Sequence, residues 1–213
     1  MVIKKVIMNG VLTTKTGLSI GGTKNDIGIG TSDNPIIKNP LTNQPYVPGS
    51  SIKGKMRSLF ESAGLQKGKD SEICGCGRKD CVVCKMFGAH TNTKNAELGS
   101  PRVLFRDAML SPEFERLENV IEIKTETCID RATGVAKNGS LRQKERIAAG
   151  VNFDYEIVIL VHDTDDKDEL VELVKSGLRM IEATGLGSKT TAGYGKVDFN
   201  IDKMSIKEED FAE

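Results

Sequence analysis

The stretch VNFDYEIVILV at residues 151–161, with the amphipathic segment that follows it at residues 168–183, decides the fold of this chain. The first part is rich in β-branched and aromatic residues, which predicts a strand. In the second part apolar residues recur at helical spacing, which predicts a helix with one buried face. A strand followed by such a helix indicates that helices cover a sheet. The apolar residues of the helix are Leu170, Leu173, Val174, Leu178 and Ile181.

Towards the N-terminus a strand and a helix follow in the same order. Residues 4–12 place alternate side chains on opposite sides and predict a first strand. The serines after Pro48 and Gly49 indicate the start of a helix, because a serine hydroxyl can cap the first backbone amides. Apolar residues at helical spacing extend this helix to about Ala63.

Further strands complete the predicted order strand–helix–strand–strand–helix–strand. They are expected at residues 103–105, 119–127 and 196–201, in addition to the run described first. This order predicts an α+β fold, a ferredoxin-like or RRM-like sandwich, in a single domain over residues 1–213.

Three irregular segments are long enough to carry function. Residues 16–43 form a loop rich in Gly, Asp, Asn and Thr. Residues 66–98 are an insertion that holds most of the cysteines. Residues 128–150 are polar and contain glycines between two extended runs, which predicts a protruding hairpin.

The composition is that of a globular protein, with 38% hydrophobic residues, 28% charged residues and a formal net charge of zero. No apolar run approaches the roughly 20 residues of a membrane span. The N-terminus also lacks a signal peptide's apolar centre, so a cytoplasmic location is expected. Residues 1–161 carry a charge of +6 and residues 162–213 a charge of −6. Such a chain could stack head to tail, or simply carry a solvated acidic C-terminal part.

The cysteines form a cluster in the pattern CxCx4CxxC, at Cys74, Cys76, Cys81 and Cys84. In a reducing cytoplasm this clustering indicates a metal rather than disulfides. Four cysteines would close the coordination shell of Zn²⁺, so the pattern predicts a structural zinc site. Because the first pair is CxC rather than CxxC, His90 is a possible substitute ligand. The alternative is a loop of reduced, unliganded cysteines.

A glycine-rich turn, TGLGSKTTAGYGKV at residues 184–197, offers groups that could bind a phosphate. It leads from a helix into a strand, and a serine precedes its lysine, so it is not a P-loop. Its backbone amides, together with Lys189 and Thr190, suit the phosphate of a polynucleotide. The alternative is a flexible connection between helix and strand.

The start of the first helix offers a second such feature. Ser50 and Ser51 lie where the helix dipole and the unpaired amides attract an anion. Lys53 and Arg57 share one face of the helix. Taken alone, a charged face is usually just solvated, but together with the Lys189 turn it suggests two converging anion sites.

Catalytic side chains are scarce. His162 ends a strand and is expected to be incidental. The remaining candidates are Asp26 and Asp33 in the first glycine-rich loop. A carboxylate with a pKa of about 3.9 is a weak base at neutral pH, but it could orient a ribose 2′-hydroxyl or hold a divalent metal. On sequence alone Asp33 is more often a turn residue before a proline.

Residues 17–61, GLSIGGTKNDIGIGTSDNPIIKNPLTNQPYVPGSSIKGKMRSLFE, closely resemble the N-terminal signature of the backbone subunits of type III-A CRISPR (Csm) complexes, in the RAMP superfamily. Segments 80–88 (DCVVCKMFG), 129–136 (IDRATGVA) and 185–197 match the same family in order. The resemblance implies an RRM-like palm with a thumb hairpin and a zinc-bearing insertion. It also implies that several copies stack head to tail along a guide CRISPR RNA, beside other Csm subunits.

The resemblance further implies roles for individual residues. Asp33 would cleave target RNA with Mg²⁺ or another divalent metal within the assembled complex, as the 2′-hydroxyl attacks the adjacent phosphate. The palm would hold the guide backbone, and the thumb would wedge into the guide–target duplex at regular intervals. The guide-holding residues would be Ser50, Ser51, Lys53, Arg57 and Lys189, and the thumb residues Ile129, Asp130 and Arg131.

Two departures from this pattern leave alternatives open. The sheet lacks the aromatic-rich RRM signature, so bases are not expected to stack on it. No histidine accompanies Asp33, so cleavage is expected to be slow and to rely on RNA geometry and a metal. The main alternative is a non-catalytic RNA-binding filament or capping subunit of such a complex. A guide-processing RAMP endonuclease and a zinc-stabilised regulator are further alternatives.

Overall fold

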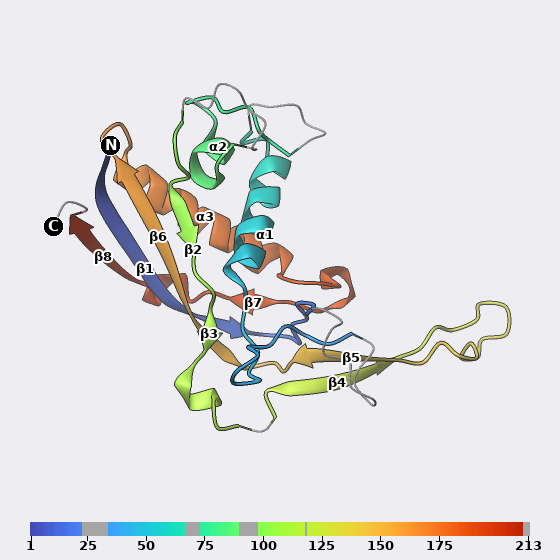
Figure 1. Ribbon diagram of the computed structural model, residues 1–213. Helices are drawn as coiled ribbons and strands as arrows, with labels where there is room; N and C mark the ends of the chain where they lie inside the picture. The colour runs from blue at the N-terminus through green and yellow to red at the C-terminus, as the bar shows by residue number, and fades with distance from the viewer. Residues whose placement is uncertain (23–33, 67–72, 90–97, 118, 211–213) are drawn as a thin grey trace.

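Two long antiparallel strands, β1 (Val2–Thr14) and β6 (Asn152–His162), form the centre of the main sheet (Figure 1). Their register places Met8 opposite Ile157, and both side chains are buried. Alternate residues of each strand therefore enter the core, as the period of two requires. The computed structural model describes residues 1–22, 34–66, 73–89, 98–117 and 119–210.

The remaining elements follow along the described chain. The helices are α1 (Gly49–Ser62), α2 (Val82–Phe87) and α3 (Lys167–Thr184). The strands are β2 (Val103–Phe105), β3 (Met109–Leu110), β4 (Ile121–Glu126), β5 (Arg142–Ile147), β7 (Val197–Asp198) and β8 (Ser205–Asp210). Short 3₁₀ turns lie at Pro112–Phe114, Thr190–Ala192 and Ile201–Lys203.

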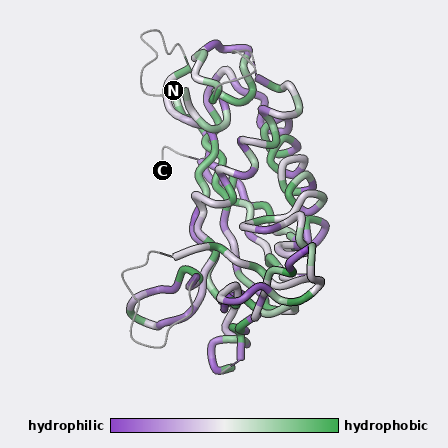
Figure 2. The backbone as a smooth tube through the Cα atoms, turned by 90° about the vertical axis from the view of Figure 1, so that its right-hand side faces the viewer, coloured by the Kyte–Doolittle hydropathy of each residue, from purple (hydrophilic) through white to green (hydrophobic). Residues whose placement is uncertain are grey.

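The strands of the main sheet lie in the order β2, β6, β1, β7, and neighbours are antiparallel. β3 also pairs with β6, and β8 pairs with β1 on the edge that faces away from β6. The helices lie on one side of this sheet, as Figure 2 shows from the side. The strands predicted at residues 4–12 and 151–161, which are β1 and β6, thus occupy the centre of the sheet. The predicted ferredoxin-like α+β sandwich is confirmed.

The two long helices pack against each other as well as against the sheet. α1 buries Ile52, Met56 and Phe60, the stripe expected from its periodicity. Gly177 of α3 permits the close approach, because a Cβ atom there would lie 2.6 Å from the Met56 side chain. No helix in the described part of the chain is long and apolar enough to cross a membrane.

Three elements differ from the sequence prediction. The last predicted strand, at residues 196–201, is reduced to β7, because Asn200 takes a left-handed backbone with φ of 48° and starts a 3₁₀ turn. β8 has no apolar alternation, since all six of its residues are exposed, and it was not predicted. Its carboxylates pair with lysines outside β8, for example Lys4 with Glu208 at 3.1 Å. α2 lies unpredicted within the cysteine insertion.

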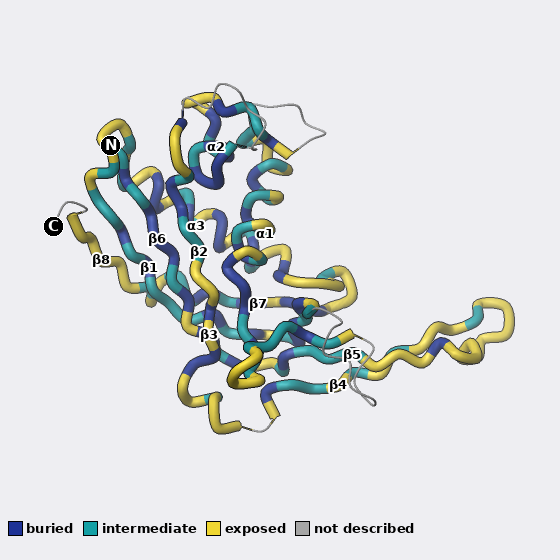
Figure 3. Tube along the Cα trace, in the orientation of Figure 1, coloured by how far each residue is buried: buried dark blue, intermediate teal, exposed yellow. Residues whose placement is uncertain are grey.

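The β4–β5 hairpin leaves the body of the protein and carries a long, exposed tip (Figures 1 and 3). Its first strand, β4, lies before the predicted insertion at residues 128–150, and its second strand, β5, lies within that insertion. Ser140 fixes the base of the tip, where its hydroxyl lies 2.9 Å from the Thr127 hydroxyl and donates to the Lys137 carbonyl at 2.6 Å.

Candidate nucleic-acid interface and metal centre

The sulfur atoms of Cys74, Cys76, Cys81 and Cys84 all lie within 4.8 Å of one another. Cys74 Sγ is 3.7 Å from Cys76 Sγ, 3.6 Å from Cys81 Sγ and 3.7 Å from Cys84 Sγ. Disulfide sulfurs would be about 2.05 Å apart. A tetrahedral metal with sulfur bonds of about 2.3 Å requires sulfurs about 3.8 Å apart, which these distances match closely. The four thiols therefore form a group that could hold a metal ion.

Local structure explains how this pattern converges. Cys81 directly precedes α2 and Cys84 lies within it, so the two residues share one face of the first helical turn. Gly77 supplies a left-handed backbone, with φ of 65°, in the loop between the two cysteine pairs. Burial raises the pKa of the Cys84 thiol, so a thiolate at this position needs a nearby cation.

Arg57 joins the cysteine group to α1. Its guanidinium donates to the Cys74 carbonyl at 2.6 Å and pairs with Glu61 at 3.0 Å. The Glu61 carboxylate in turn accepts from the Cys74 amide at 3.1 Å. The side chain of Arg57 is only 18% exposed in this arrangement. Arg57 thus tethers the insertion, and its predicted contact with RNA stays a prediction.

A distant carboxylate caps the start of α1. The N-cap residue, Pro48, makes no side-chain hydrogen bond to the helix, and the Gly49 amide donates to Asp107 Oδ1 at 2.8 Å. The expectation that a serine caps this helix is therefore wrong, because a residue after β2 reaches the amide instead. Ser50 is exposed and Ser51 and Lys53 are half-buried at this end of the helix, and their contacts with RNA stay predictions.

The glycine-rich turn is closely packed. A Cβ atom at Gly195 would lie 1.9 Å from the Leu186 carbonyl oxygen. The Leu186 amide donates to the Gly195 carbonyl at 2.8 Å, and the Ser188 amide donates to the Ser19 carbonyl at 2.9 Å. These amides are thus used within the protein. A phosphate at this turn would rely more on side chains than the sequence suggested.

Lys189 stands at a strained position in this turn. Its φ of 55° is left-handed, which costs a non-glycine residue roughly 1–2 kcal/mol and often marks a functional position. Its ammonium donates to Glu126, and the Tyr194 hydroxyl donates to the same carboxylate at 2.6 Å. Lys144 lies 3.8 Å from that carboxylate. The hydrogen bonds from Lys189 and Tyr194 lower the pKa of Glu126 to about 2.

A hollow of about 240 Å³ opens beside this cluster, and its lining includes Lys144, Lys189, Tyr194 and Asn34. Asn34 directly follows Asp33 in the sequence, and its carbonyl accepts from the amide after Lys144 at 3.3 Å. None of the predicted guide-holding residues of α1 lines this hollow. The convergence of the two anion sites therefore stays a prediction.

The tip of the β4–β5 hairpin presents the predicted thumb residues. Asp130 accepts from the amides of Ala132 and Thr133 at 2.9 and 3.1 Å, which holds the turn in shape. Those hydrogen bonds, first from Thr133 and then from Ala132, lower the pKa of Asp130. Ile129 is 59% exposed and Arg131 is exposed, so both are accessible to a partner. Their insertion into a duplex stays a prediction.

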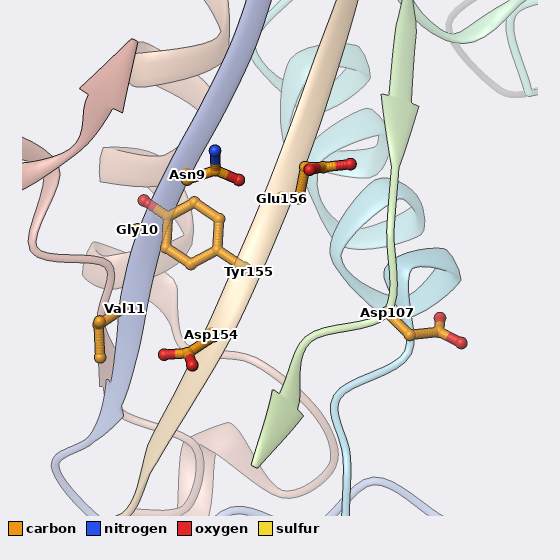
Figure 4. A pocket seen from close by; sticks show the side chains of 7 residues that line it. All are labelled: Asn9, Gly10, Val11, Asp107, Asp154, Tyr155 and Glu156. Carbon is orange, nitrogen blue, oxygen red and sulfur yellow. The ribbon is translucent and has the colours of Figure 1, made fainter. Parts of the chain in front are cut away.

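The open face of the sheet carries an acidic hollow of about 450 Å³ (Figure 4). Asp154 and Glu156 of β6 line it together with Asp107. Tyr155, the aromatic residue of this hollow, is buried, and its hydroxyl donates to the Phe199 carbonyl at 3.0 Å. Carboxylates repel phosphates, so this hollow does not suit RNA. The expectation that bases do not stack on the sheet stays a prediction.

Some predicted site residues lie outside the described part of the chain, and two further charged residues join the site. Asp26, Asp33 and His90 lie outside them, and their roles stay predictions. Sequence reasoning missed Glu126 and Lys144, which alternate with other charges in β4 and β5 and carry no local signal. A signal arises only from the pairing of the strands, which sets Lys144 opposite Lys124, and like charges in that position destabilise a sheet.

Comparison with known proteins identifies the family. The model of the RAMP superfamily matches residues 11–198. The chain is 36% identical to the CRISPR system Cms endoribonuclease Csm3 of Methanocaldococcus jannaschii, covering 98% of this chain and 84% of that protein. It is 35% identical to the protein of the same name from Streptococcus thermophilus, covering 93% and 89%.

Solved structures agree with this match. A crystal structure of a Csm3–Csm4 subcomplex of the type III-A CRISPR–Cas interference complex contains a chain 27% identical, with a TM-score of 0.61, covering 99% of this chain and 82% of that one. A chain of the type III-B Cmr-β complex bound to cognate target RNA shares the fold, with a TM-score of 0.64 at 22% identity, covering 95% and 61%. The chain therefore belongs to the RAMP superfamily and, within it, to the Csm3 family.

Proposed function

We propose that this chain is the guide-RNA-binding backbone subunit of a type III-A CRISPR complex and that it cleaves complementary target RNA at regular intervals. The observation that carries this proposal is the match to Csm3 endoribonucleases, at 31–37% identity over nearly the whole chain. The likeness to a chain of a Csm3–Csm4 subcomplex supports other Csm subunits as partners. Further copies of the chain would stack head to tail along the guide.

The described surface supports this role in two places. The hairpin tip around Ile129, Asp130 and Arg131 is exposed and shaped by its own hydrogen bonds, as a wedge between base pairs would need to be. The hollow beside Lys189 carries lysines that could neutralise phosphates. Guide phosphates would be held there and at the start of α1, by Ser50, Ser51, Lys53, Arg57, Lys189 and Thr190.

For the cysteine group we propose a structural Zn²⁺. The donor set fits, because four soft sulfur ligands at tetrahedral spacing leave no position open for a substrate. Cys74, Cys76, Cys81 and Cys84 would hold the ion. Their role would be to order the insertion that Arg57 and Glu61 attach to α1.

We assign cleavage to Asp33. A divalent ion such as Mg²⁺, when bound, would stabilise the charge that develops on the phosphate. The carboxylate would orient the ribose 2′-hydroxyl, which attacks the adjacent phosphorus and releases the next nucleotide's 5′-oxygen, leaving a cyclic phosphate and a 5′-hydroxyl. The cytoplasm, which holds both the guide and its targets, is the expected location.

The test is cleavage of end-labelled target RNA by the assembled guide complex with magnesium. Asp33→Ala should retain target binding but slow the regularly spaced cuts by roughly 100-fold or more. Asp26→Ala, in the same loop, is the control and should cut at a normal rate. If Asp33→Ala cuts as fast as the unaltered protein, the chain is a non-catalytic filament or capping subunit, or another residue performs the cleavage.

A further inference from the structure

The hollow beside the glycine-rich turn holds more positive charge than its own carboxylate neutralises. Lys189 and Lys144 both contact Glu126. Lys124 lies 4.8 Å from the ring centre of Tyr194, the residue whose hydroxyl also binds Glu126. Two ammonium groups thus lie at the Glu126 carboxylate, and a third lies over the ring of the tyrosine that binds it. The other cation at this ring, Arg146, is already paired with a glutamate at 2.6 Å.

This arrangement is costly for the folded chain alone. Lys144 and Lys124 stand directly opposite each other in the β4–β5 register, where like charges repel. The neighbouring Lys189 lowers the pKa of Lys144, so Lys144 is also repelled by the lysine of the turn. Lys189 in addition adopts a left-handed backbone. A second anion in the hollow would relieve the repulsion among these lysines.

The hollow is lined by a residue that neighbours Asp33 in the sequence. This residue, Asn34, pairs with Lys144 in an isolated bridge, and its carbonyl accepts from the Glu145 amide of β5 at 3.3 Å. The residue before Asn34 in the sequence is Asp33, to which cleavage is assigned. Ser188 lines the hollow as well and adds a hydroxyl donor.

We infer that Lys144 and Lys189 bind one phosphodiester of RNA in this hollow, and that Glu126 acts as an internal anion that neutralises the two lysines until the RNA arrives. The inference rests on the proposed function and adds Lys144 and Glu126 to it. Phosphate and carboxylate compete for the same two ammonium groups, so Glu126 weakens the binding of any polyanion. Only RNA that gains contacts elsewhere on the subunit then binds tightly.

The first arm of the test measures binding of a labelled single-stranded guide to the purified chain at several salt concentrations. Lys144→Met should weaken binding and reduce the slope of log affinity against log salt by about 0.7, the value for one phosphate contact on a single strand. Lys144→Arg should restore the slope. Lys207→Met on the edge strand β8 is the matched control and should behave as the unaltered chain.

Glu126→Gln keeps the shape and the acceptor oxygen of the side chain but removes its charge. It should tighten guide binding roughly threefold to tenfold at low salt, because a negative charge near the phosphate is lost. Weaker binding of Glu126→Gln would show instead that Glu126 positions the lysines and would overturn the internal-anion role. The phosphate site itself would be overturned if Lys144→Met melts normally but leaves the salt slope unchanged, both with guide alone and with target RNA in the assembled complex.

The second arm repeats the measurement with target RNA and the assembled guide complex. If the slope changes only there, the phosphate belongs to the target strand; if it changes with guide alone, it belongs to the guide. The cleavage assay keeps the two proposals apart. A Lys144→Met complex that still cuts target at regular intervals leaves the nuclease function standing, whatever its binding shows.

Discussion

At the scale of single residues, Gly195 shows how tightly the lysine-bearing turn is built. Its φ is +72°, and a Cβ atom would lie 1.9 Å from the Leu186 carbonyl oxygen. Gly195→Ala should therefore combine the left-handed penalty of roughly 1–2 kcal/mol with an overpacking cost of roughly 1–3 kcal/mol. Urea unfolding measures the loss in the free energy of unfolding.

Gly193 in the same turn is the matched control for Gly195. Its φ is +85°, but nothing lies within 4 Å of the position of its Cβ atom. Gly193→Ala should lower the free energy of unfolding only by the left-handed backbone penalty of roughly 1–2 kcal/mol. Equal losses for the two variants would mean that the turn can move away from Leu186 and is not held as closely as the structure indicates.

Single residues also show where sequence reasoning stops. Lys189 could be singled out because it stands in a glycine-rich turn, and the cysteines because their spacing is that of metal ligands. Glu126 and Lys144 could not, since they meet only through the pairing of β4 with β5 and through the turn that folds back onto them. Arg57 could be singled out from the sequence, but its contacts could not be predicted. Its charge was expected to face outward, and it instead holds the cysteine insertion.

At the scale of elements, α2 and its loop depend on the cysteine group. α2 has only six residues, which is too short to be stable by itself. We expect the purified protein to contain one zinc per chain, and Cys84→Ser to lose it. Removing the metal should raise hydrogen exchange in α2 strongly and in α3 very little, because α3 packs on the sheet.

Cys128→Ser is the control for the zinc measurement, because Cys128 is exposed and lies outside the cluster. It should keep the full zinc content by elemental analysis. Full zinc in Cys84→Ser would mean that another ligand, such as His90, replaces the lost sulfur. Collapse of the whole protein on chelation would mean that the metal supports the entire fold and not the insertion alone.

Elements with a strong apolar period were the ones that sequence could predict. β1, β6, α1 and α3 all bury one face, and the sequence predicted each of them. β8 has no buried face and is held by backbone pairing with β1 and by surface ion pairs, which leave no periodic trace. α2 was not predicted either, because the cysteine pattern of its segment indicated metal ligands in a loop and not a helix.

At the scale of the whole molecule, the uneven charge along the sequence is partly neutralised within the chain. The acidic strand β8 lies beside the basic start of β1, and Lys5 pairs with Glu209 at 3.1 Å. Lys167 at the start of α3 pairs with Glu208 at 2.6 Å. Part of the acidic charge of the C-terminal region is thus paired with lysines of β1 and does not remain free on the surface.

One buried ion pair joins the cysteine insertion to the main sheet and to α3. Arg102, just before β2, pairs with Asp165 at 2.6 Å, and the two side chains are 5% and 3% exposed. The Asp165 carboxylate also accepts from the His162 amide at 3.1 Å and lies 3.5 Å from the ammonium of Lys85 in α2. Removing one partner of a buried pair leaves the other charge uncompensated. Asp165→Asn should therefore lower the free energy of unfolding by about 3–5 kcal/mol.

The free energy that Asp165 contributes to folding depends on pH. Burial is the largest single effect on the pKa of Asp165 and raises it, but the hydrogen bonds from Arg102 and the His162 amide, together with the positive charges of Arg102 and Lys85, outweigh burial and hold the pKa below its usual value. The stabilisation is then complete above the unfolded pKa of about 3.9 and is lost as the pH falls through the lower folded value. The gap between the unaltered protein and Asp165→Asn should thus be constant from pH 5 to 7 and shrink below about pH 4. Asp163→Asn, with a carboxylate 60% exposed, should cost far less, because water screens an exposed ion pair, and an equal cost for both variants would mean that the Arg102–Asp165 pair does not hold these segments together.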